Sequence, residues 1–322
     1  MTAGLPWRGM RRAGVLGINA RNQLYTLRWN PRRFYPLVDD KLATKRLCEE
    51  QGIPVPRLLA TAHHHFELRR LLGELERWSS FVLKPVRGAM GNGIVVVLGR
   101  ALDGFVRSGG REISRDGFVY HAAGIISGLY SLAGHSDAAM VEERLQAHPA
   151  LAGLCTDGVP DVRVIVYRGI PVMSMTRLPT RQSAGRANLH QGAIGAGIDL
   201  STGITHHAIL RGRPTDTNPD SGVSVLGVPI PDFERVLEIA VRATDQTGLG
   251  YVGADVVVDA HLGPVILEMN ARPGLAIQLA NRIGLQHRLD AVDALPERPR
   301  ALADRVACGR EIAERCRVLE AA

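Results

Sequence analysis

Lysine is the residue that this sequence almost lacks. Of 39 basic residues, three are lysines, at positions 41, 45 and 84, and all the others are arginines. A lysine ammonium is a compact charge on a flexible stem, whereas an arginine guanidinium is a planar fork. The positions that keep lysine are therefore candidates for sites that need a compact cation, although chance could also produce this distribution.

Long apolar runs and metal-binding cysteine patterns are also missing. No stretch of about 18 apolar residues is present to span a bilayer, and the first residues lack the apolar core of a secretory signal. Four cysteines are scattered with neither CxxC nor Cys/His ligand spacing, which fits reduced thiols rather than a disulfide framework or a zinc site. We therefore expect a cytoplasmic protein that does not associate with membranes.

Chain length and net charge limit the classes of protein to which this sequence can belong. The chain has 322 residues, of which 45% are hydrophobic, so it is long enough for two or three subdomains and excludes a disordered or fibrous protein. The net charge of +7 is spread along the chain, and no basic run is interleaved with aromatic residues. An arginine-rich surface explains this charge better than a nucleic-acid partner.

The most informative stretch consists of two apolar segments, residues 250–259 and 264–274. Both are rich in β-branched residues and a short turn joins them, which predicts a β-hairpin. Glu268 and Asn270 are two positions apart and share a face, and the partner strand can bring Asp255 to meet them. Three oxygen donors on an apolar hairpin favour a hard cation, and Mg²⁺ with open positions for substrate phosphates fits best. The alternative is a solvated sheet face with a turn carboxylate.

A lysine-bearing strand precedes a glycine-rich loop. Residues 80–85 predict a buried strand that carries Lys84, and a buried ammonium needs an anion as its partner. Gly88, Gly91 and Gly93 follow in a flexible loop whose backbone N–H groups could cover phosphates. This loop matches neither a Walker A loop nor a Rossmann fingerprint, so the pattern alone is not specific.

A helix is predicted over about residues 41–51, with an acidic pair as its cap and a glycine at its end. Lys41 opens this helix, where a neighbouring loop could present a phosphate to it. Taken alone, Lys41 and Lys45 would be interpreted as exposed helix cations.

A second hairpin is predicted over residues 161–177, with its turn at Arg168 and Gly169. Asp161 and Arg163 share a face of its first strand. A structural ion pair and a substrate contact explain these two residues equally well.

A polar, glycine-rich loop follows at residues 181–197. It carries Arg186, Asn188 and His190, side chains that suit contacts to a phosphate or to a developing negative charge. The same composition is equally typical of an ordinary exposed loop.

In this order and at this spacing, the motifs resemble the ATP-grasp superfamily and, within it, the RimK-like α-L-glutamate ligases. The resemblance runs from about residue 39 to residue 284, roughly three quarters of the chain. It rests on Asp40–Lys41–Leu42, Val82–Leu83–Lys84 with its glycine loop, Asp161–Val162–Arg163, Arg186–Gly192, and Asp255 with Glu268–Gly274.

The resemblance implies an α+β fold in which two lobes with antiparallel sheets clasp ATP. It divides the chain into three parts. Residues 1–80 would form an N-terminal arm and a helical segment in place of a longer pre-grasp region. Residues 81–145 would form a central lobe with the glycine loop, and residues 146–322 a C-terminal lobe with the metal-binding hairpin and a helical tail.

The resemblance also implies roles for single residues. Glu142, Glu143 and Arg144 would lie at the adenine hinge, although Arg144 stands where an aromatic residue is usual. Asp255, Glu268 and Asn270 would bind Mg²⁺, for which Mn²⁺ is the alternative. The implied nucleotide-binding set comprises Lys41, Lys84, Gly88, Gly91, Gly93, Glu142, Glu143, Arg144, Asp161, Arg186 and Asn188.

The implied activity is ATP-dependent carboxylate–amine ligation through an acylphosphate. Such chemistry needs positioning and charge neutralisation rather than a protein nucleophile, and the sequence has no Ser/His/Asp or Cys/His constellation. The candidate catalytic residues are Arg186 and Arg272, which would grip carboxylate or acylphosphate oxygens, Asn188 near the γ-phosphate, and His190. The histidine would either carry the amine proton or only shape its loop.

The main departure from the family lies at the N-terminus. About 38 residues precede the Asp-Lys-Leu motif, where typical members have an α/β domain that helps to form the acceptor site. The sequence is most similar to the α-L-glutamate ligase-like subgroup with a short N-terminus, which implies bacterial origin.

We therefore expect an amino-acid donor such as glutamate and a peptide, protein or small-molecule carboxylate acceptor. A partner protein or a dimer could complete the acceptor site. Two other interpretations stay open, namely a small-molecule kinase on the same fold and a non-catalytic nucleotide-binding partner of another enzyme.

Overall fold

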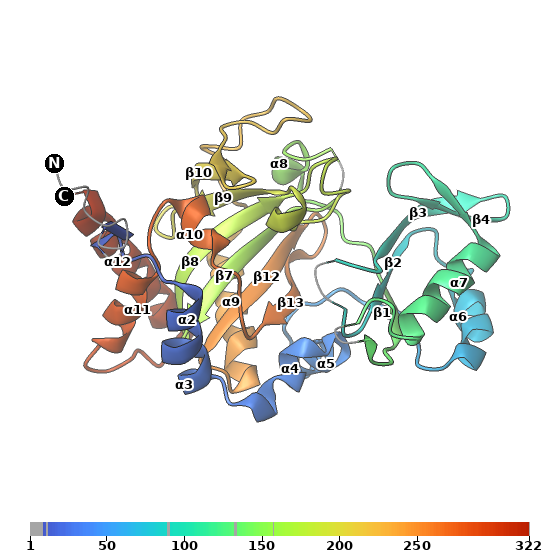
Figure 1. Ribbon diagram of the computed structural model, residues 1–322, viewed down its shortest axis with the longest axis horizontal. Helices are drawn as coiled ribbons and strands as arrows, with labels where there is room; N and C mark the ends of the chain where they lie inside the picture. Colours follow the sequence, from blue (N-terminus) through green and yellow to red (C-terminus); the bar gives the residue numbers. More distant parts are fainter. Residues whose placement is uncertain (1–8, 11, 89–90, 132–133, 157, 322) are drawn as a thin grey trace. The chain divides into compact units, whose positions relative to one another are not determined.

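The computed structural model describes residues 9–10, 12–88, 91–131, 134–156 and 158–321, with side chains up to residue 317. The chain forms two compact units (Figure 1). The larger unit comprises residues 1–39, 43–54 and 147–322, and the smaller unit comprises residues 40–42 and 55–146.

The smaller unit is built on a six-stranded antiparallel sheet in the order β1-β6-β2-β3-β4-β5. Phe81, Phe105 and Phe118 meet in its core, with ring centroids 4.9–5.9 Å apart. Its elements are β1 (Leu58–Ala62), η3 (His65–Glu67), α6 (Leu68–Leu75), β2 (Phe81–Pro85), β3 (Val95–Ala101), β4 (Gly104–Arg107), β5 (Glu112–Ser114), α7 (Arg115–Ile126) and β6 (Ala139–Glu142).

Local sequence explains the helices of this unit. Leu68, Leu71 and Leu75 recur at helical spacing in α6, and all three are buried. The Ser114 hydroxyl accepts a hydrogen bond from the Gly117 N–H at 3.1 Å, so this serine caps the N-terminus of α7.

The larger unit is built on a seven-stranded antiparallel sheet in the order β11-β10-β9-β8-β7-β12-β13. Its strands are β7 (Asp161–Tyr167), β8 (Ile170–Leu178), β9 (Ile194–Ile198), β10 (Thr205–Leu210), β11 (Arg213–Pro214), β12 (Tyr251–Asp259) and β13 (Gly263–Asn270). Both predicted hairpins, β7–β8 and β12–β13, are confirmed by their antiparallel registers.

Helices surround this second sheet. The amphipathic helix α9 packs on β12 and β13, and α10 packs on β9 and β10 (Figure 1). The helices of the larger unit are α2 (Ile18–Ala20), the π-helix η1 (Arg21–Thr26), α3 (Leu27–Trp29), η2 (Arg32–Phe34), α4 (Pro36–Asp39), α8 (Pro149–Ala152), η5 (Leu189–Gln191), α9 (Phe233–Thr247), α10 (Ala276–Asn281), α11 (Gln286–Asp293) and α12 (Leu302–Ala321). None of the helices in the described part of the chain is long and apolar enough to span a bilayer.

The helix predicted over residues 41–51 is present as α5 (Lys41–Glu50). The interpretation of Lys45 as an exposed cation is wrong, because this side chain is buried, with 5% exposure. The helical face on which Lys45 lies is fixed by packing, which a single lysine in the sequence does not reveal.

The two units differ from the predicted three-part division. Residues 55–80 were expected with the N-terminal arm, but they belong to the smaller unit, because β1 pairs with β6 and α6 packs on β1. Pairing between strands nearly eighty positions apart leaves no local pattern in the sequence. Residues 1–8 and 11 of the predicted arm lie outside the described residues.

Candidate active site

Asp255 occupies the centre of a buried charge network in the larger unit. In β12 it lies opposite Glu268 of β13 on one side and opposite Arg163 of β7 on the other. Arg163 donates from Nε to Oδ1 of Asp255 at 2.7 Å and from Nη2 to Oδ2 at 2.6 Å. Asp255 has no exposed surface. Its charge is therefore stabilised by a bidentate arginine rather than by water.

Arg177 of β8 links this aspartate to a second one. Its Nη2 donates to Asp255 Oδ2 at 2.6 Å and to Asp161 Oδ2 at 2.5 Å, and its Nε donates to Asp161 Oδ1 at 2.6 Å. Asp161 and Arg163, which the sequence left as a candidate ion pair, thus pair with partners on neighbouring strands. Cross-strand neighbours lie closer together than side chains two positions apart on one strand, which explains this choice.

The network gives Asp255 and Asp161 different pKa values. Burial alone would raise the pKa of Asp255, but the positive charges of Arg163 and Arg177 outweigh it and lower the pKa to about 2. For Asp161 burial outweighs the pairing with Arg177 and raises the pKa to about 6. Asp255 is therefore firmly ionised and remains an acceptor for cations.

Arg177 was not among the residues singled out from the sequence. Counting outward from the turn at Arg168 and Gly169 would place Thr176 opposite Asp161. A register shift between Ile165 and Val166 places Arg177 there instead, and no local pattern in the sequence reveals this shift.

The candidate metal ligands lie beside this network. Glu268 and Asn270 share a face of β13, both are half-buried, and Asn270 Nδ2 lies 3.4 Å from Glu268 Oε1. Glu268 lies within hydrogen-bonding reach of Asp255. The structure thus brings the three predicted oxygen donors together. Alternation puts Glu268 and Asn270 on one face of β13, and a register shift between Asp255 and Val256 places Glu268 opposite Asp255.

The donor set fits Mg²⁺. Asp255 Oδ1 accepts one of the arginine hydrogen bonds and Oδ2 accepts two, so the arginines engage Oδ1 less than Oδ2. Within the described residues no group of three or more His, Cys, Asp or Glu side chains could hold a metal ion. An ion at this place would therefore rely on two carboxylates and one amide, and would take its other ligands from substrate or water, as Mg²⁺ commonly does.

The smaller unit holds Lys84 in β2. Its ammonium forms an ion pair with Glu142 of β6, and the two side chains are 5% and 4% exposed. The anion that a buried lysine needs is thus supplied by the protein itself, from a strand 58 positions away. Lys84 is held in one place by this pairing.

Lys41 lies at the glycine loop of the same unit. Its Nζ donates to the Gly88 carbonyl at 2.8 Å. A Cβ on Gly93, whose φ is +76°, would come within 2.6 Å of the Tyr130 ring, so this position requires glycine. Gly91 also has a positive φ, of 74°. Ala89 and Met90, at the tip of the predicted loop, lie outside the described residues.

The predicted hinge follows β6. The Glu143 N–H donates to the Arg57 carbonyl at 2.9 Å, so this donor is already used within the protein. Glu143 is exposed and Arg144 is half-buried, and Arg144 Nε has no hydrogen-bond partner within the described part of the chain. Any main-chain contact to a base would therefore involve groups other than the Glu143 N–H.

The polar loop of the larger unit leads into η5. Asn188 Oδ1 accepts a hydrogen bond from the His190 N–H at 3.0 Å and so caps this short helix. Among the described residues, no hydrogen bond occupies the Asn188 amide nitrogen, the half-buried Arg186 side chain or the exposed His190 ring. No described contact links Arg186 or His190 to the Asp255 network.

Arg272 lies two residues after Asn270, the last residue of β13. It is exposed, and its guanidinium carbon lies 5.3 Å from the centre of the Tyr35 ring. A cation over an aromatic face is weakly held. Among the described residues the Arg272 side chain makes no hydrogen bond, so its donors could bind an anionic ligand.

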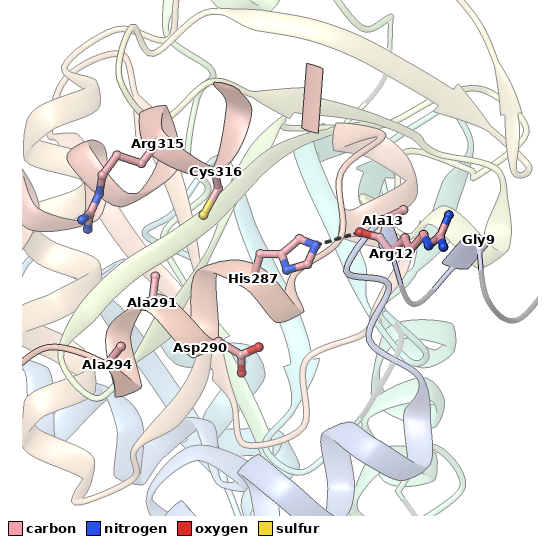
Figure 2. A pocket seen from close by; sticks show the side chains of 9 residues that line it. All are labelled: Gly9, Arg12, Ala13, His287, Asp290, Ala291, Ala294, Arg315 and Cys316. Atoms are coloured by element: carbon pink, nitrogen blue, oxygen red, sulfur yellow. Dashed lines mark hydrogen bonds between the residues drawn. The ribbon is translucent and has the colours of Figure 1, made fainter. Parts of the chain in front are cut away.

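A cavity of about 830 Å³ lies elsewhere in the larger unit (Figure 2). The His287 ring donates from Nε2 to the Arg12 carbonyl at 3.0 Å across it. None of the predicted site residues lines this cavity. Its lining consists of Gly9, Arg12, Ala13, His287, Asp290, Ala291, Ala294, Arg315 and Cys316.

Comparison with known proteins gives one family match and several distant relatives. The family model described as "Sugar-transfer associated ATP-grasp" matches residues 20–294. A curated protein of Enterobacter sp. (strain 638), "Probable alpha-L-glutamate ligase", is 23% identical over 236 residues, which are 73% of this chain and 56% of that protein. The chain thus spans little more than half the length of this curated relative.

Solved structures resemble the chain at low identity. The ATP-grasp ligase PsnB, complexed with its minimal precursor, is 17% identical with a TM-score of 0.43, and the alignment covers 87% of this chain and 63% of PsnB. D-alanine–D-alanine ligase from Bacillus anthracis is 14% identical with a TM-score of 0.43, covering 88% and 70% of the two chains. A RimK domain ATP-grasp protein from Sphaerobacter thermophilus is 15% identical with a TM-score of 0.45, covering 84% and 72%.

The family match can be compared with the resemblance that the sequence suggested. The two antiparallel sheets and the family match confirm the predicted α+β ATP-grasp fold. The family match confirms the ATP-grasp assignment, and the curated α-L-glutamate ligase is a distant relative in line with its RimK-like branch. Because the family model covers most of the sequence, the chain belongs to the Sugar-transfer associated ATP-grasp family.

Proposed function

We propose that this protein is an ATP-dependent carboxylate–amine ligase that works through an acylphosphate. The observation that carries the proposal is the grouping of Asp255, Glu268 and Asn270 beside a buried arginine pair, in a chain of the ATP-grasp family. Phosphoryl transfer is catalysed mainly by positioning and by neutralising charge, and these are the groups that such a site needs.

Residues of both units would act on the nucleotide. Lys41, Lys84 and the loop from Gly88 to Gly93 would hold phosphates, since the lysines carry compact charges and the loop offers backbone N–H groups. The segment Glu142–Arg144 would lie along the base through its main chain. Asp161 would lie near the nucleotide, where its link to Arg177 fixes it.

Glu268, Asn270 and Oδ1 of Asp255 would hold Mg²⁺, or Mn²⁺ in its place. The bound metal would neutralise the phosphate charge. Arg163 and Arg177 keep Asp255 ionised and fix its orientation, so the chain presents this carboxylate in one position.

The reaction would proceed in two steps. The acceptor carboxylate attacks the γ-phosphorus of ATP, ADP leaves, and an acylphosphate forms. The amine of the incoming amino acid then attacks the carbonyl carbon, phosphate leaves, and the amine loses one proton. Arg186 and Arg272 would bind the carboxylate and acylphosphate oxygens, with Asn188 beside the γ-phosphate and His190 placed to accept the amine proton.

The substrates follow from the curated relative and the chemistry of the site. A glutamate-like amino acid would supply the amine, as the name of that relative suggests. The acceptor would be a carboxylate of a peptide, protein or small molecule. A partner protein or a second copy of the chain would complete the acceptor site, and the reaction would take place in the cytoplasm of a bacterium, where ATP is available.

The test is incubation with ATP, Mg²⁺, pooled amino acids and candidate carboxylates, followed by mass spectrometry and an ADP-release assay. The expected result is an amide product whose mass is greater by one amino-acid residue, with ADP release that depends on both substrates. Glu268→Ala should abolish turnover. Glu238→Ala should not, because Glu238 lies on α9 and pairs with Arg235.

Two experimental outcomes would contradict this proposal and identify a different function. A stable phosphorylated product that forms without an amine would identify a small-molecule kinase. Nucleotide binding without any turnover in wild-type protein would instead identify a nucleotide-binding partner of another enzyme.

A further inference from the structure

Asn30 continues the β12–β13 ladder at the end that carries Asn270. It is 2% exposed, and its Nδ2 donates to the carbonyls of Tyr251 at 2.7 Å and Ala271 at 2.8 Å. Its Oδ1 accepts from the Tyr251 N–H at 2.9 Å. The strand pairing ends with Gly253 opposite Asn270. The Asn30 amide, which offers both donors and an acceptor, thus replaces the next peptide unit of the ladder.

Two further residues of the N-terminal arm, defined here as residues 18–39, contact the chain just after Asn270. Arg21 is 8% exposed, and its Nη1 donates to the Pro273 carbonyl at 2.7 Å. Tyr35 lies under the guanidinium of Arg272. The arm therefore contacts three successive residues, 271, 272 and 273, that follow the candidate metal ligand.

Asn30 itself is fixed from its own side. It lies at the C-terminal end of α3, where its N–H donates to the Thr26 carbonyl at 2.9 Å. The preceding residue, Trp29, accepts a hydrogen bond through its carbonyl from the Gly250 N–H at 2.9 Å. The side-chain amide of Asn30 is thus presented to β12 and β13 from a helix end that two backbone hydrogen bonds hold.

From this geometry we propose that Asn30 is a positioning residue for the metal. It fixes where the chain leaves β13 after Asn270, and so the direction in which the Glu268 and Asn270 oxygens and the Arg272 guanidinium point. Residues that orient metal ligands typically change metal affinity by about 10–100-fold when they are removed. The inference rests on the proposed function, because it takes Glu268 and Asn270 as ligands.

The test is Mn²⁺ binding in the presence of ADP, measured from the electron paramagnetic resonance signal of free Mn²⁺. Asn30→Ala removes all three hydrogen bonds, while Asn30→Asp keeps the volume of the side chain but loses both N–H donors. We expect the apparent Kd for Mn²⁺ to rise about tenfold or more in both variants. ADP binding without metal, measured by equilibrium dialysis, should stay as in the wild type.

The matched control is Asn218→Ala. Asn218 is also buried, and its Nδ2 donates to the Leu154 carbonyl at 2.6 Å, but none of its described hydrogen bonds reaches β12 or β13. All variants are compared at a temperature at which circular dichroism shows them folded, and if Asn30→Ala does not fold, Asn30→Asp decides. A role in stability alone would leave the Kd of folded protein unchanged.

The outcomes separate this inference from the proposed function. If the wild type and both Asn30 variants bind Mn²⁺ equally well, Asn30 does not position the metal, and the proposed function still stands. If wild-type protein binds no Mn²⁺ with ADP, the metal site and this inference fail together.

Discussion

At the scale of single residues, Arg177 is the cation that the buried charge network around Asp255 needs most. One guanidinium serves two carboxylates, Asp161 and Asp255, and all three residues are buried. An ionised group in the interior is tolerated only with a partner, and removing that partner leaves an uncompensated buried charge. Arg163 continues to neutralise Asp255 when Arg177 is lost, but Asp161 then has no cation bonded to it within the described network.

We therefore predict that Arg177→Met lowers the free energy of unfolding by about 3–5 kcal/mol, the usual result of breaking a buried ion pair. Urea denaturation measures this. Adding Asp161→Asn to Arg177→Met should recover part of the loss, because the unpaired charge is then removed. Arg317→Met is the control, since that side chain is 51% exposed and such surface pairs contribute about 0–1 kcal/mol. Equal losses in Arg177→Met and Arg317→Met would contradict a structural role for the network.

At the scale of elements, the β12–β13 hairpin packs tightly against the loop that follows β13 and contains Pro273. A Cβ on Gly253 would lie 2.7 Å from the Cβ of Pro273. Gly253 is also the strand partner of Asn270. A side chain at this position would therefore push apart the strand and the loop that together orient the candidate metal ligands.

Gly253→Ala should destabilise the protein by about 1–3 kcal/mol, as overpacking of a filled interior usually does. The same variant should also weaken Mn²⁺ binding, because Asn270 lies directly opposite. Gly99→Ala in β3 is the matched control, since a Cβ there meets no atom within 4 Å. Chemical denaturation and Mn²⁺ titration of both variants are the measurements, and a Gly253→Ala protein as stable as Gly99→Ala would show that the loop can yield.

At the scale of the whole molecule, the candidate site residues are divided between the two units. The phosphate-binding candidates Lys41, Lys84 and the glycine loop belong to the smaller unit, and the metal ligands belong to the larger one. If the proposed function holds, impairing either set weakens nucleotide binding and so lowers the stabilisation that the nucleotide provides. Binding to the folded state alone stabilises a protein by about 2.7 kcal/mol at a ligand concentration 100 times the Kd.

We predict that a non-hydrolysable ATP analogue with Mg²⁺ raises the Tm by several degrees and that EDTA reverses most of this shift. Lys84→Ala in one unit and Glu268→Ala in the other should each reduce the shift, whereas Glu238→Ala should retain it. Differential scanning fluorimetry over a series of ligand concentrations measures the effect. A full shift in Lys84→Ala would mean that the smaller unit takes no part in nucleotide binding.

Local pattern was enough to predict several parts of this molecule. The strands β12 and β13, their hairpin, and the common face of Glu268 and Asn270 follow from β-branched runs, a turn and a period of two, which are properties of adjacent residues. The helix that begins at Lys41 follows from an acidic cap and a terminal glycine. The order of these motifs was sufficient for the ATP-grasp superfamily, which the match over residues 20–294 confirms, but it did not single out the sugar-transfer associated family.

Only the tertiary structure decided which charges meet. Lys84 finds Glu142 because β2 pairs with β6, and Asp255 finds Arg163 because β12 lies beside β7. Asn30 reaches Tyr251 across 221 positions of sequence. Hydrophobic periodicity predicts which residues are buried. It does not predict which strands become neighbours, because packing over the whole sheet sets the strand order. The sequence by itself therefore determined the elements and the oxygen donors, while the fold determined the cations that hold those donors in place.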